Sequence, residues 1–223
     1  MRNLTLLIPA KNEKESLPSV LEELKFLNCD KKIILEESDI ETINSTKGFK
    51  CELIFQKNKG YGNALIEGIN ATNTEYFCIF NADGSFIPRE IASMMEKIEL
   101  DNIDFLFASR YENNSGSDDD TFITLIGNYF FSTLGRLFFN LPITDILYTF
   151  VIGRTEKAKN LHLKMNDFRF CVELPIKAKK MKMNLSSINS YERSRIAGVK
   201  KVNAFKDGFL ILKHMIYLFF KNK

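Results

Sequence analysis

The chain has 223 residues and carries 31 Lys and Arg against 28 Asp and Glu, which gives a formal net charge of +3 at pH 7. Hydrophobic residues make up 45% of the chain and charged residues 26%, as in an ordinary soluble globular domain, so extensive disorder is not expected. The near balance of charge argues against a general nucleic-acid-binding surface. Cys29, Cys51, Cys78 and Cys171 include no Cys-x-x-Cys pair, and we expect reduced core residues.

Strand-like and helix-like patterns alternate along most of the chain, with short β-forming apolar runs between segments of helical spacing. This order predicts a mostly parallel, Rossmann-like α/β sheet with helices on both faces. The expected strands cover residues 4–8, 33–35, 51–55, 76–80 and 105–108, and the expected helices cover residues 17–26, 40–46, 64–71 and 89–100. We further expect a strand-like run after Asp145, a helix over residues 168–181 and a last strand over residues 185–191.

Two amphipathic helices are expected beyond this alternation. Residues 122–141 place apolar side chains at helical spacing beside a polar stripe that includes Arg136. Because a charge and two asparagines make a bilayer span expensive, we expect this helix to pack on the domain or lie at a membrane surface. Residues 202–220 form the second, which suits a membrane interface or a position docked on the core.

Oxygen-bearing side chains follow the strand over residues 76–80. Asn81 and Asp83 project to the same side, at the carboxyl end of that strand, where ligands bind in open α/β sheets. An amide and a carboxylate oxygen suit a hard divalent cation that holds a diphosphate. The alternative is an Asx turn that closes the strand, because Asn, Asp and Gly are also the commonest turn residues.

Basic side chains could stabilise the charge that builds on a diphosphate leaving group. Arg110, Arg195 and Lys201 are the candidates, with solvated surface charge as the alternative for each. An acceptor that is a sugar hydroxyl would need a carboxylate base, and Asp145 or Glu173 could serve. A lipid phosphate is already ionised near pH 7 and would need cations instead. The basic segment that contains Arg193, Arg195, Lys200 and Lys201 therefore favours a phosphate-bearing lipid acceptor.

Four short motifs, in order, resemble those of family 2 glycosyltransferases. They are Leu7-Ile-Pro-Ala-Lys-Asn-Glu13, Gly60-Tyr-Gly-Asn-Ala-Leu65, Asn81-Ala-Asp-Gly84 at the place of the family's DxD motif, and Arg195-Ile-Ala-Gly-Val-Lys-Lys201. The last resembles the R-x-x-G-x-S-K element of the dolichyl-phosphate mannose synthase-like and polyprenyl-phosphate sugar transferase branch. The resemblance covers about residues 4–205.

The resemblance implies a GT-A fold that binds a nucleotide-diphospho-sugar. It places Pro9, Ala10 and Glu13 near the base and ribose, with Glu36 as the acidic residue after the second strand. It implies that Asp83, helped by Asn81, holds Mg²⁺ or Mn²⁺ on the diphosphate. The remaining residues expected at the donor site are Lys59, Gly60, Asn63, Ala82 and Arg110, and the residues expected in catalysis are Asp145, Glu173, Arg195 and Lys201.

The chain departs from the family pattern at several positions. Asn81 replaces the first aspartate of DxD, which weakens but does not abolish a cation site. The usual D-D-G-S reads Glu36-Glu-Ser-Asp39, Thr149 replaces the glycine of D-x-x-x-G-F, and Lys200 replaces the serine of R-x-x-G-x-S-K. The last three changes suggest a distinct acceptor.

These features predict an inverting, metal-assisted glycosyltransferase that moves a sugar from a GDP- or UDP-linked donor to a lipid-phosphate, lipid-linked or glycan acceptor. Residues 1–201 would form the catalytic domain and residues 202–223 a C-terminal, membrane-interface helix. Because Met1-Arg-Asn3 leads directly into a strand pattern, we expect no signal peptide and a cytoplasmic enzyme, peripheral on the inner face of a membrane. The alternatives are a membrane-associated scaffold with weakened activity and a sugar nucleotidylyltransferase, which would need a glycine-rich loop after the first strand. The oligomeric state is left open.

Overall fold

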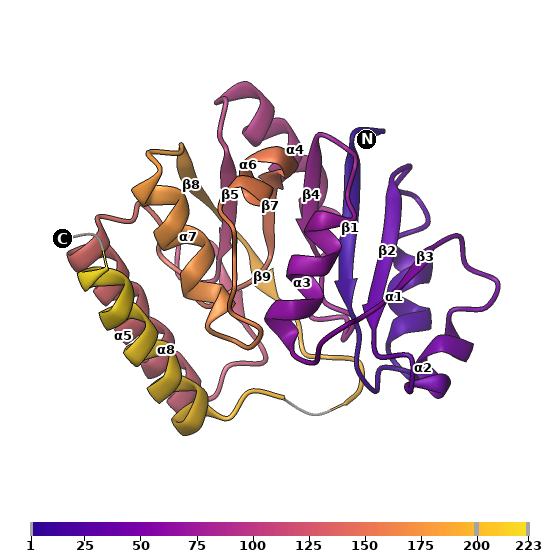
Figure 1. Cartoon of the computed structure of the whole chain (residues 1–223). Helices are drawn as coiled ribbons and strands as arrows, with labels where there is room; N and C mark the ends of the chain where they lie inside the picture. Colours follow the sequence, from indigo (N-terminus) through magenta and orange to yellow (C-terminus); the bar gives the residue numbers. More distant parts are fainter. Residues whose placement is uncertain (1, 199–200, 222–223) are drawn as a thin grey trace.

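The computed structural model describes residues 2–198 and 201–221. Its centre is a seven-stranded sheet in the order β3-β2-β1-β4-β7-β5-β8 (Figure 1). The strands of this sheet are β1 (Leu4–Pro9), β2 (Asp30–Leu35), β3 (Glu52–Phe55), β4 (Tyr76–Ile79), β5 (Phe105–Ser109), β7 (Val151–Arg154) and β8 (Leu185–Asn189). The short strands β6 (Gly116–Ser117) and β9 (Tyr191–Glu192) form a separate pair.

All strands of the main sheet are parallel except β7, which runs antiparallel to both β4 and β5. The mostly parallel sheet expected from the sequence is therefore confirmed, whereas the direction of β7 was not predicted. The register pairs Ile79 with Val151. Because antiparallel neighbours count in opposite directions, the residues just after β4 lie beside those just before β7.

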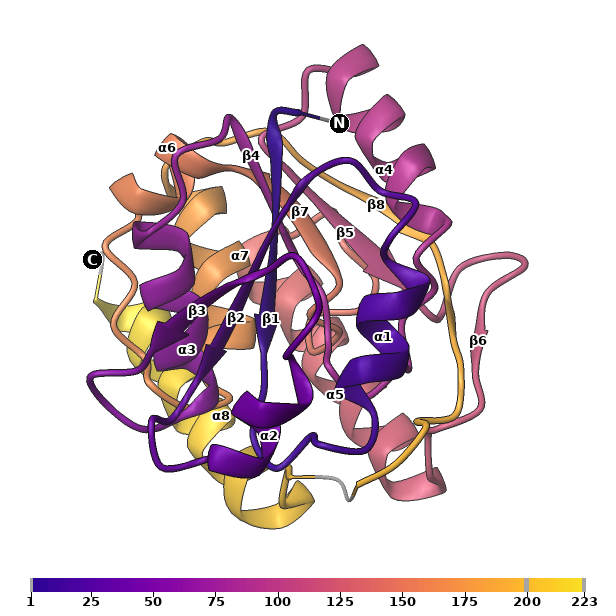
Figure 2. The same ribbon diagram turned by 90° about the vertical axis from the view of Figure 1, so that its right-hand side faces the viewer.

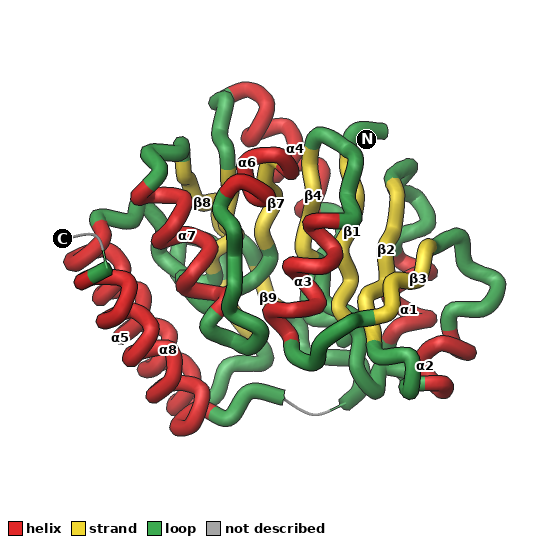
Figure 3. The backbone as a smooth tube through the Cα atoms, in the orientation of Figure 1, coloured by secondary structure: helices red, strands yellow, loops and turns green. Residues whose placement is uncertain are grey.

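Helices cover both faces of the sheet, as the views in Figures 2 and 3 show. One apolar core lies between the sheet and the first set of helices, and a second core lies on the opposite face. The first set comprises α1 (Leu17–Glu23), α2 (Ile40–Ser45) and α4 (Glu90–Leu100), and the second comprises α3 (Tyr61–Asn70), α6 (Thr155–Asn160) and α7 (Phe170–Lys180). The sequence did not predict α6.

Two long helices, α5 (Phe122–Phe139) and α8 (Ala204–Phe220), lie outside α7 and beside each other (Figure 1). Phe138 packs against Phe219 and Phe131 lies near Gly208, so the two helices run in the same direction. Both were expected as helices, and α8 buries Ile211 in the second core. Within the described residues, α5 alone is long and apolar enough to cross a membrane, with a mean hydropathy of 1.2.

Candidate active site

Asp83 lies in a tight turn directly after β4. Its Oδ1 accepts hydrogen bonds from the Ser85 backbone N at 3.0 Å and from the Ser85 Oγ at 2.7 Å. This is the Asx turn considered as the alternative, and Gly84 adopts a left-handed φ of 82°, which glycine reaches without steric cost. The turn occupies only one carboxylate oxygen. The side chain is 14% exposed and its Oδ2 faces Arg195.

The segment that carries Arg195 crosses over this turn. Arg193 N donates to the Ser85 carbonyl and Ile196 N donates to the Asp83 carbonyl, each at 2.8 Å. A Cβ on Gly84 would collide with the Ile196 side chain, so the absence of a side chain at position 84 permits this approach. The two backbone bonds fix Arg195 beside Asp83, although the two residues are 112 positions apart in the sequence.

Arg195 lies between two carboxylates. Its Nη1 is 3.8 Å from Asp83 Oδ2, and its Nη2 is 2.8 Å from Asp119 Oδ2. The hydrogen bond to Asp119 is the main cause of a raised pKa at Arg195. At 22% exposure the guanidinium is accessible to a ligand, and its longer contact with Asp83 leaves room for an anion. The predicted neighbourhood of Asp83 and Arg195 is thus present.

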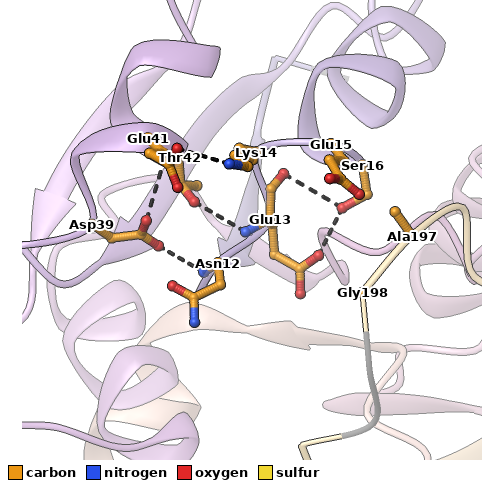
Figure 4. Close-up of a pocket in the computed structure, with 10 residues that line it drawn as sticks. All are labelled: Asn12, Glu13, Lys14, Glu15, Ser16, Asp39, Glu41, Thr42, Ala197 and Gly198. Carbon is orange, nitrogen blue, oxygen red and sulfur yellow. Dashed lines mark hydrogen bonds and ion pairs between the residues drawn. The ribbon is translucent and has the colours of Figure 1, made fainter.

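Glu13 lines a pocket of about 250 Å³ at the end of β1, together with Asp39 and Thr42 (Figure 4). Glu13 Oε2 accepts from Ser16 Oγ at 2.7 Å, and Glu13 Oε1 is paired with the Lys201 ammonium group. Ala197 and Gly198 also line this pocket. The late segment therefore contacts the first loop as well as the Asp83 turn. Lys200 lies outside the described residues.

Glu36 lies at the carboxyl end of β2 beside a second pocket of about 460 Å³. Lys11 and Lys59 pair with its two oxygens at 3.1 and 3.2 Å. Their hydrogen bonds lower the pKa of Glu36, so the carboxylate stays ionised. Pro9 ends β1, and the buried Ala10 bonds to the neighbouring β2 through its backbone N. Glu13 therefore lines the first pocket and Glu36 the second, whereas Pro9 and Ala10 lie in and just after β1.

The glycine loop before α3 is held in shape by its own residues. Gly60 has a φ of 120°, and a Cβ there would collide with the Asn166 carbonyl. Asn63 Nδ2 donates to the Asn58 carbonyl at 2.7 Å and to Glu67 Oε1 at 2.5 Å. Gly60 and Asn63 therefore shape the loop that presents Lys59.

Arg110 and Asp145 form a buried pair that the sequence did not anticipate. Arg110 Nε and Nη2 bond to the two Asp145 oxygens at 2.7 and 3.1 Å, and Nη1 bonds to Glu192 at 2.9 Å. Burial alone would lower the pKa of Arg110, but Asp145 and Glu192 outweigh it and hold the pKa above its usual value. Asp145 is 1% exposed and Arg110 occupies both of its oxygens, so this geometry favours a structural role over the predicted roles in clamping and base catalysis.

Glu173 is also engaged elsewhere. It is 1% exposed on α7, accepts hydrogen bonds from the backbone N of Lys164 and Met165, and pairs with Lys177 at 2.7 Å. These contacts hold the loop before α7, and within the described residues Glu173 makes no bond to the Asp83 turn or to Arg195.

Two contributors to the site were missed in the sequence. Asp119 pairs with Arg195, and Tyr61 contacts both Asn81 and Thr149 through its hydroxyl. Asp119 lies in a run of three aspartates and Tyr61 in Gly-Tyr-Gly, so both motifs were visible, but neither motif names its partner. Asn81 follows β4 as expected, and its neighbour Ala82 is buried.

The residues of this site fit a divalent cation that is shared with a ligand. The described residues contain no cluster of three or more His, Cys, Asp or Glu that could hold a metal unaided. However, Asp83 Oδ2 is not used by the turn, and Mg²⁺ is commonly held by one or two carboxylates together with substrate phosphates and water. Asp83 can therefore supply the protein ligand for a cation whose other ligands come from a diphosphate.

Comparisons with known proteins agree with this geometry. The model of Glycosyl transferase family 2 matches residues 5–161. UDP-N-acetylglucosamine–dolichyl-phosphate N-acetylglucosaminyltransferase of Methanococcus voltae is 26% identical over 209 residues, which cover 82% of each chain.

Solved structures share the fold. Glucosyl-3-phosphoglycerate synthase from Mycobacterium tuberculosis in complex with uridine diphosphate aligns with a TM-score of 0.75 and 12% identity, over 98% of this chain and 80% of that one. Mannosyl-3-phosphoglycerate synthase from Rubrobacter xylanophilus also gives 0.75, with 13% identity, over 96% and 72%. The mycobacterial enzyme has been crystallised with Mn²⁺ and uridine diphosphate as well. The fold, the order of the motifs and the family match over residues 5–161 together show that the chain is a glycosyltransferase of family 2, built on the GT-A fold.

Proposed function

We propose that this enzyme transfers a sugar, with inversion, from a nucleotide-diphospho-sugar to a lipid phosphate at a membrane surface. The observation that carries the proposal lies at the carboxyl end of the sheet. There Asp83, which has one carboxylate oxygen outside its turn, lies beside the accessible guanidinium of Arg195. The donor base and the transferred sugar are left open.

The chemistry needs negative charge to be stabilised on the diphosphate as the sugar bond breaks. Arg195 can supply forked N–H donors to phosphate oxygens, since its contact with Asp83 is long and its other partner lies on a surface loop. Mg²⁺ or Mn²⁺ bound at Asp83 would add a second positive charge on the same group. Lys201 is the other predicted clamp, and its pairing with Glu13 keeps it at the rim of the same site.

A phosphate acceptor agrees with the environment of the two carboxylates that were expected to act as a base. Asp145 and Glu173, the two carboxylates expected to act as a base, are both buried and engaged in ion pairs. An ionised phosphate oxygen can attack without losing a proton, because its second pKa is about 6. The Methanococcus relative acts on dolichyl phosphate and the solved neighbours act on phosphoglycerate, so each of these acceptors bears a phosphate.

The outer surface of α5 and α8 favours a lipid acceptor over a soluble one. Helix α5 turns the middle of its polar stripe inward, where Asn128 donates to the Tyr111 hydroxyl at 2.8 Å and Ser132 accepts from Ile146 N at 3.1 Å. Arg136 of the same stripe is exposed. Its apolar side faces outward, the reverse of a helix that packs on a soluble core. Large exposed apolar side chains on the two helices include Phe122, Tyr129, Leu137, Phe205, Phe209 and Phe220. Lys206, Lys213 and Lys221 accompany them, as at the surface of an anionic membrane.

Liposome binding tests this surface. Replacing Phe205 and Phe209 with serine should lower the partition coefficient onto anionic vesicles, measured by co-sedimentation, by roughly a hundredfold or more, because each of the two aromatic side chains contributes roughly 1.5–3 kcal/mol when buried in the membrane. Replacing Phe26, which is 62% exposed in the turn after α1, is the matched control and should leave sedimentation unchanged. Equal loss in both variants, or in neither, would contradict membrane docking through α5 and α8.

Transfer itself is tested with GDP-, UDP- and dTDP-sugars, Mn²⁺, and either a short polyprenyl phosphate or 3-phosphoglycerate as the acceptor. We expect product with the lipid phosphate and a loss of at least a hundredfold in Asp83→Ala. Unchanged turnover in Asp83→Ala would overturn the metal assignment. Product with 3-phosphoglycerate alone would overturn the lipid acceptor, and a chain that binds vesicles but turns over no donor would favour the scaffold alternative.

A further inference from the structure

Two positions at which the chain departs from the family pattern lie together in the structure. Asn81 follows β4 and Thr149 precedes β7, and the antiparallel register of these strands places the two residues opposite each other. Tyr61, the first residue of α3, inserts its hydroxyl between them. The hydroxyl lies 3.3 Å from Asn81 Oδ1 and 2.6 Å from Thr149 Oγ1.

The position of the Tyr61 hydroxyl is fixed by packing. The Tyr61 ring stacks on Phe168 at 5.1 Å between centroids, with 23° between the planes. Burial raises the pKa of Tyr61, so the hydroxyl keeps its proton at physiological pH. Thr149 is itself 9% exposed, which confines its hydroxyl to this contact.

The number of protons available shows which group donates in each contact of the Tyr61 hydroxyl. A tyrosine hydroxyl has one proton to donate and can also accept. Thr149 Oγ1 therefore donates to the Tyr61 oxygen, and Tyr61 donates to Asn81 Oδ1. With its carbonyl oxygen engaged, Asn81 offers its amide N–H groups, which bond to no other described residue and are not sealed from solvent.

We propose, on the basis of the proposed function, that Asn81 donates its amide hydrogen bonds to an oxygen of the nucleotide-sugar donor and is not a metal ligand, with Tyr61 and Thr149 as its positioning residues. This role differs from the metal contact expected from the sequence. An aspartate at position 81 would present only acceptors to the same ligand oxygens and would add a second negative charge near Asp83. The amide of Asn81 can instead donate hydrogen bonds to the diphosphate oxygens. Asp83 then remains the single carboxylate of this pair that can bind the cation.

The two roles of Asn81 are separated by titrating uridine diphosphate into the intact 223-residue chain at a series of Mn²⁺ concentrations. For Asn81→Ala, we expect the dissociation constant of uridine diphosphate at saturating Mn²⁺ to rise roughly tenfold, as for one lost hydrogen bond to a charged group. The Mn²⁺ concentration that gives half-maximal binding should not change. A metal-ligand role predicts the reverse, namely a higher half-maximal Mn²⁺ concentration and an unchanged affinity at saturation.

Three further variants sharpen the result. Asn81→Asp should weaken binding at saturating Mn²⁺ at least as much as Asn81→Ala, whereas a metal ligand would be improved by the added charge. Tyr61→Phe and Thr149→Val should each weaken binding about two- to fivefold, because the amide can then rotate. Tyr76→Phe is the matched control, since Tyr76 begins β4 at the opposite end of the strand.

The outcomes distinguish this inference from the proposed function. A wild-type chain that binds no uridine diphosphate at any Mn²⁺ concentration, and no GDP or dTDP in parallel, overturns the donor site and the inference with it. Wild-type binding with unchanged affinity in Asn81→Ala, Tyr61→Phe and Thr149→Val overturns the inference alone. Far-UV circular dichroism and melting temperatures matched to Tyr76→Phe show that the variants are folded.

Discussion

Two arginine–carboxylate pairs lie near each other in this molecule and differ in what their surroundings allow. Arg110 and Asp145 are buried, bonded at 2.7 and 3.1 Å, and joined by Glu192 and Asp120. Arg195 is 22% exposed and approaches Asp83 only to 3.8 Å. The first pair is closed and holds the fold, whereas the second is open and can exchange a protein partner for a ligand. Their positions in the sequence do not distinguish the two arginines, because each lies shortly after a strand.

Breaking the closed pair should have the largest effect on stability. Arg110→Leu leaves Asp145 and Glu192 buried without their cation, which costs about 3–5 kcal/mol. For a chain of this length the melting temperature should fall by about 10 °C. The double variant Arg110→Leu/Asp145→Leu is the control and should recover part of the loss, because it removes both charges. A melting temperature within 2 °C of the wild type in the single variant would show that the pair is dispensable.

Breaking the open pair should change catalysis and leave the fold intact. Arg195→Ala removes the forked donor from the leaving group, so the transfer rate should fall roughly a hundredfold. Arg195→Lys should recover only part of the rate, because an ammonium group lacks the bidentate geometry. Steady-state rates alongside thermal melts check this. A large drop in melting temperature with an unchanged rate per folded molecule would mean that Arg195 is structural, like Arg110.

Replacing Asp119 should have a smaller effect and should strengthen, not weaken, the function of the site. It bonds to Arg195 at 2.8 Å and therefore competes with a diphosphate for the same guanidinium. Asp119→Asn should lower the dissociation constant of the donor nucleotide by about two- to threefold, a change smaller than 1 kcal/mol. Glu99→Gln is a control that removes an exposed charge on α4. Weaker binding in Asp119→Asn would mean that Asp119 positions Arg195 for the donor.

The smallest effect concerns His214, which lies on the buried face of α8. Its side chain is 6% exposed, and its Nε2 has no hydrogen-bond partner among the described residues. Burial lowers its pKa from 6.5, with Glu173 raising it and Arg169 and Lys177 lowering it further. Because the unfolded chain then binds the proton more tightly, stability should fall as the pH drops below about 6.5. Thermal melts at pH 7.5 and 5.5 should differ less in His214→Gln than in the wild type, and an equal difference would contradict this account.

The sequence predicted the strands of the main sheet and most of the helices, because each of these carries its own apolar periodicity, but it missed α6 and the short strands β6 and β9. It did not predict that β7 is antiparallel, since a four-residue apolar strand has no marker of direction. Asp83 and Arg195 were identified because each lies in a recognisable motif. The roles of Asp145 and Glu173 were not, because whether a carboxylate is free or paired depends on which distant side chain reaches it. Tyr61 was missed for the same reason, as its contact with Thr149 spans 88 positions.

The proposed chemistry depends most on Asp83 as the protein ligand of a cation shared with the donor diphosphate. A crystal structure with Mn²⁺ and uridine diphosphate, or with GDP if that nucleotide binds instead, tests this directly. We expect an anomalous manganese peak about 2 Å from Asp83 Oδ2, with phosphate oxygens completing the coordination and Arg195 turned toward them. A manganese peak or a diphosphate away from the Asp83 turn, with Arg195 still bonded to Asp119, would contradict the account.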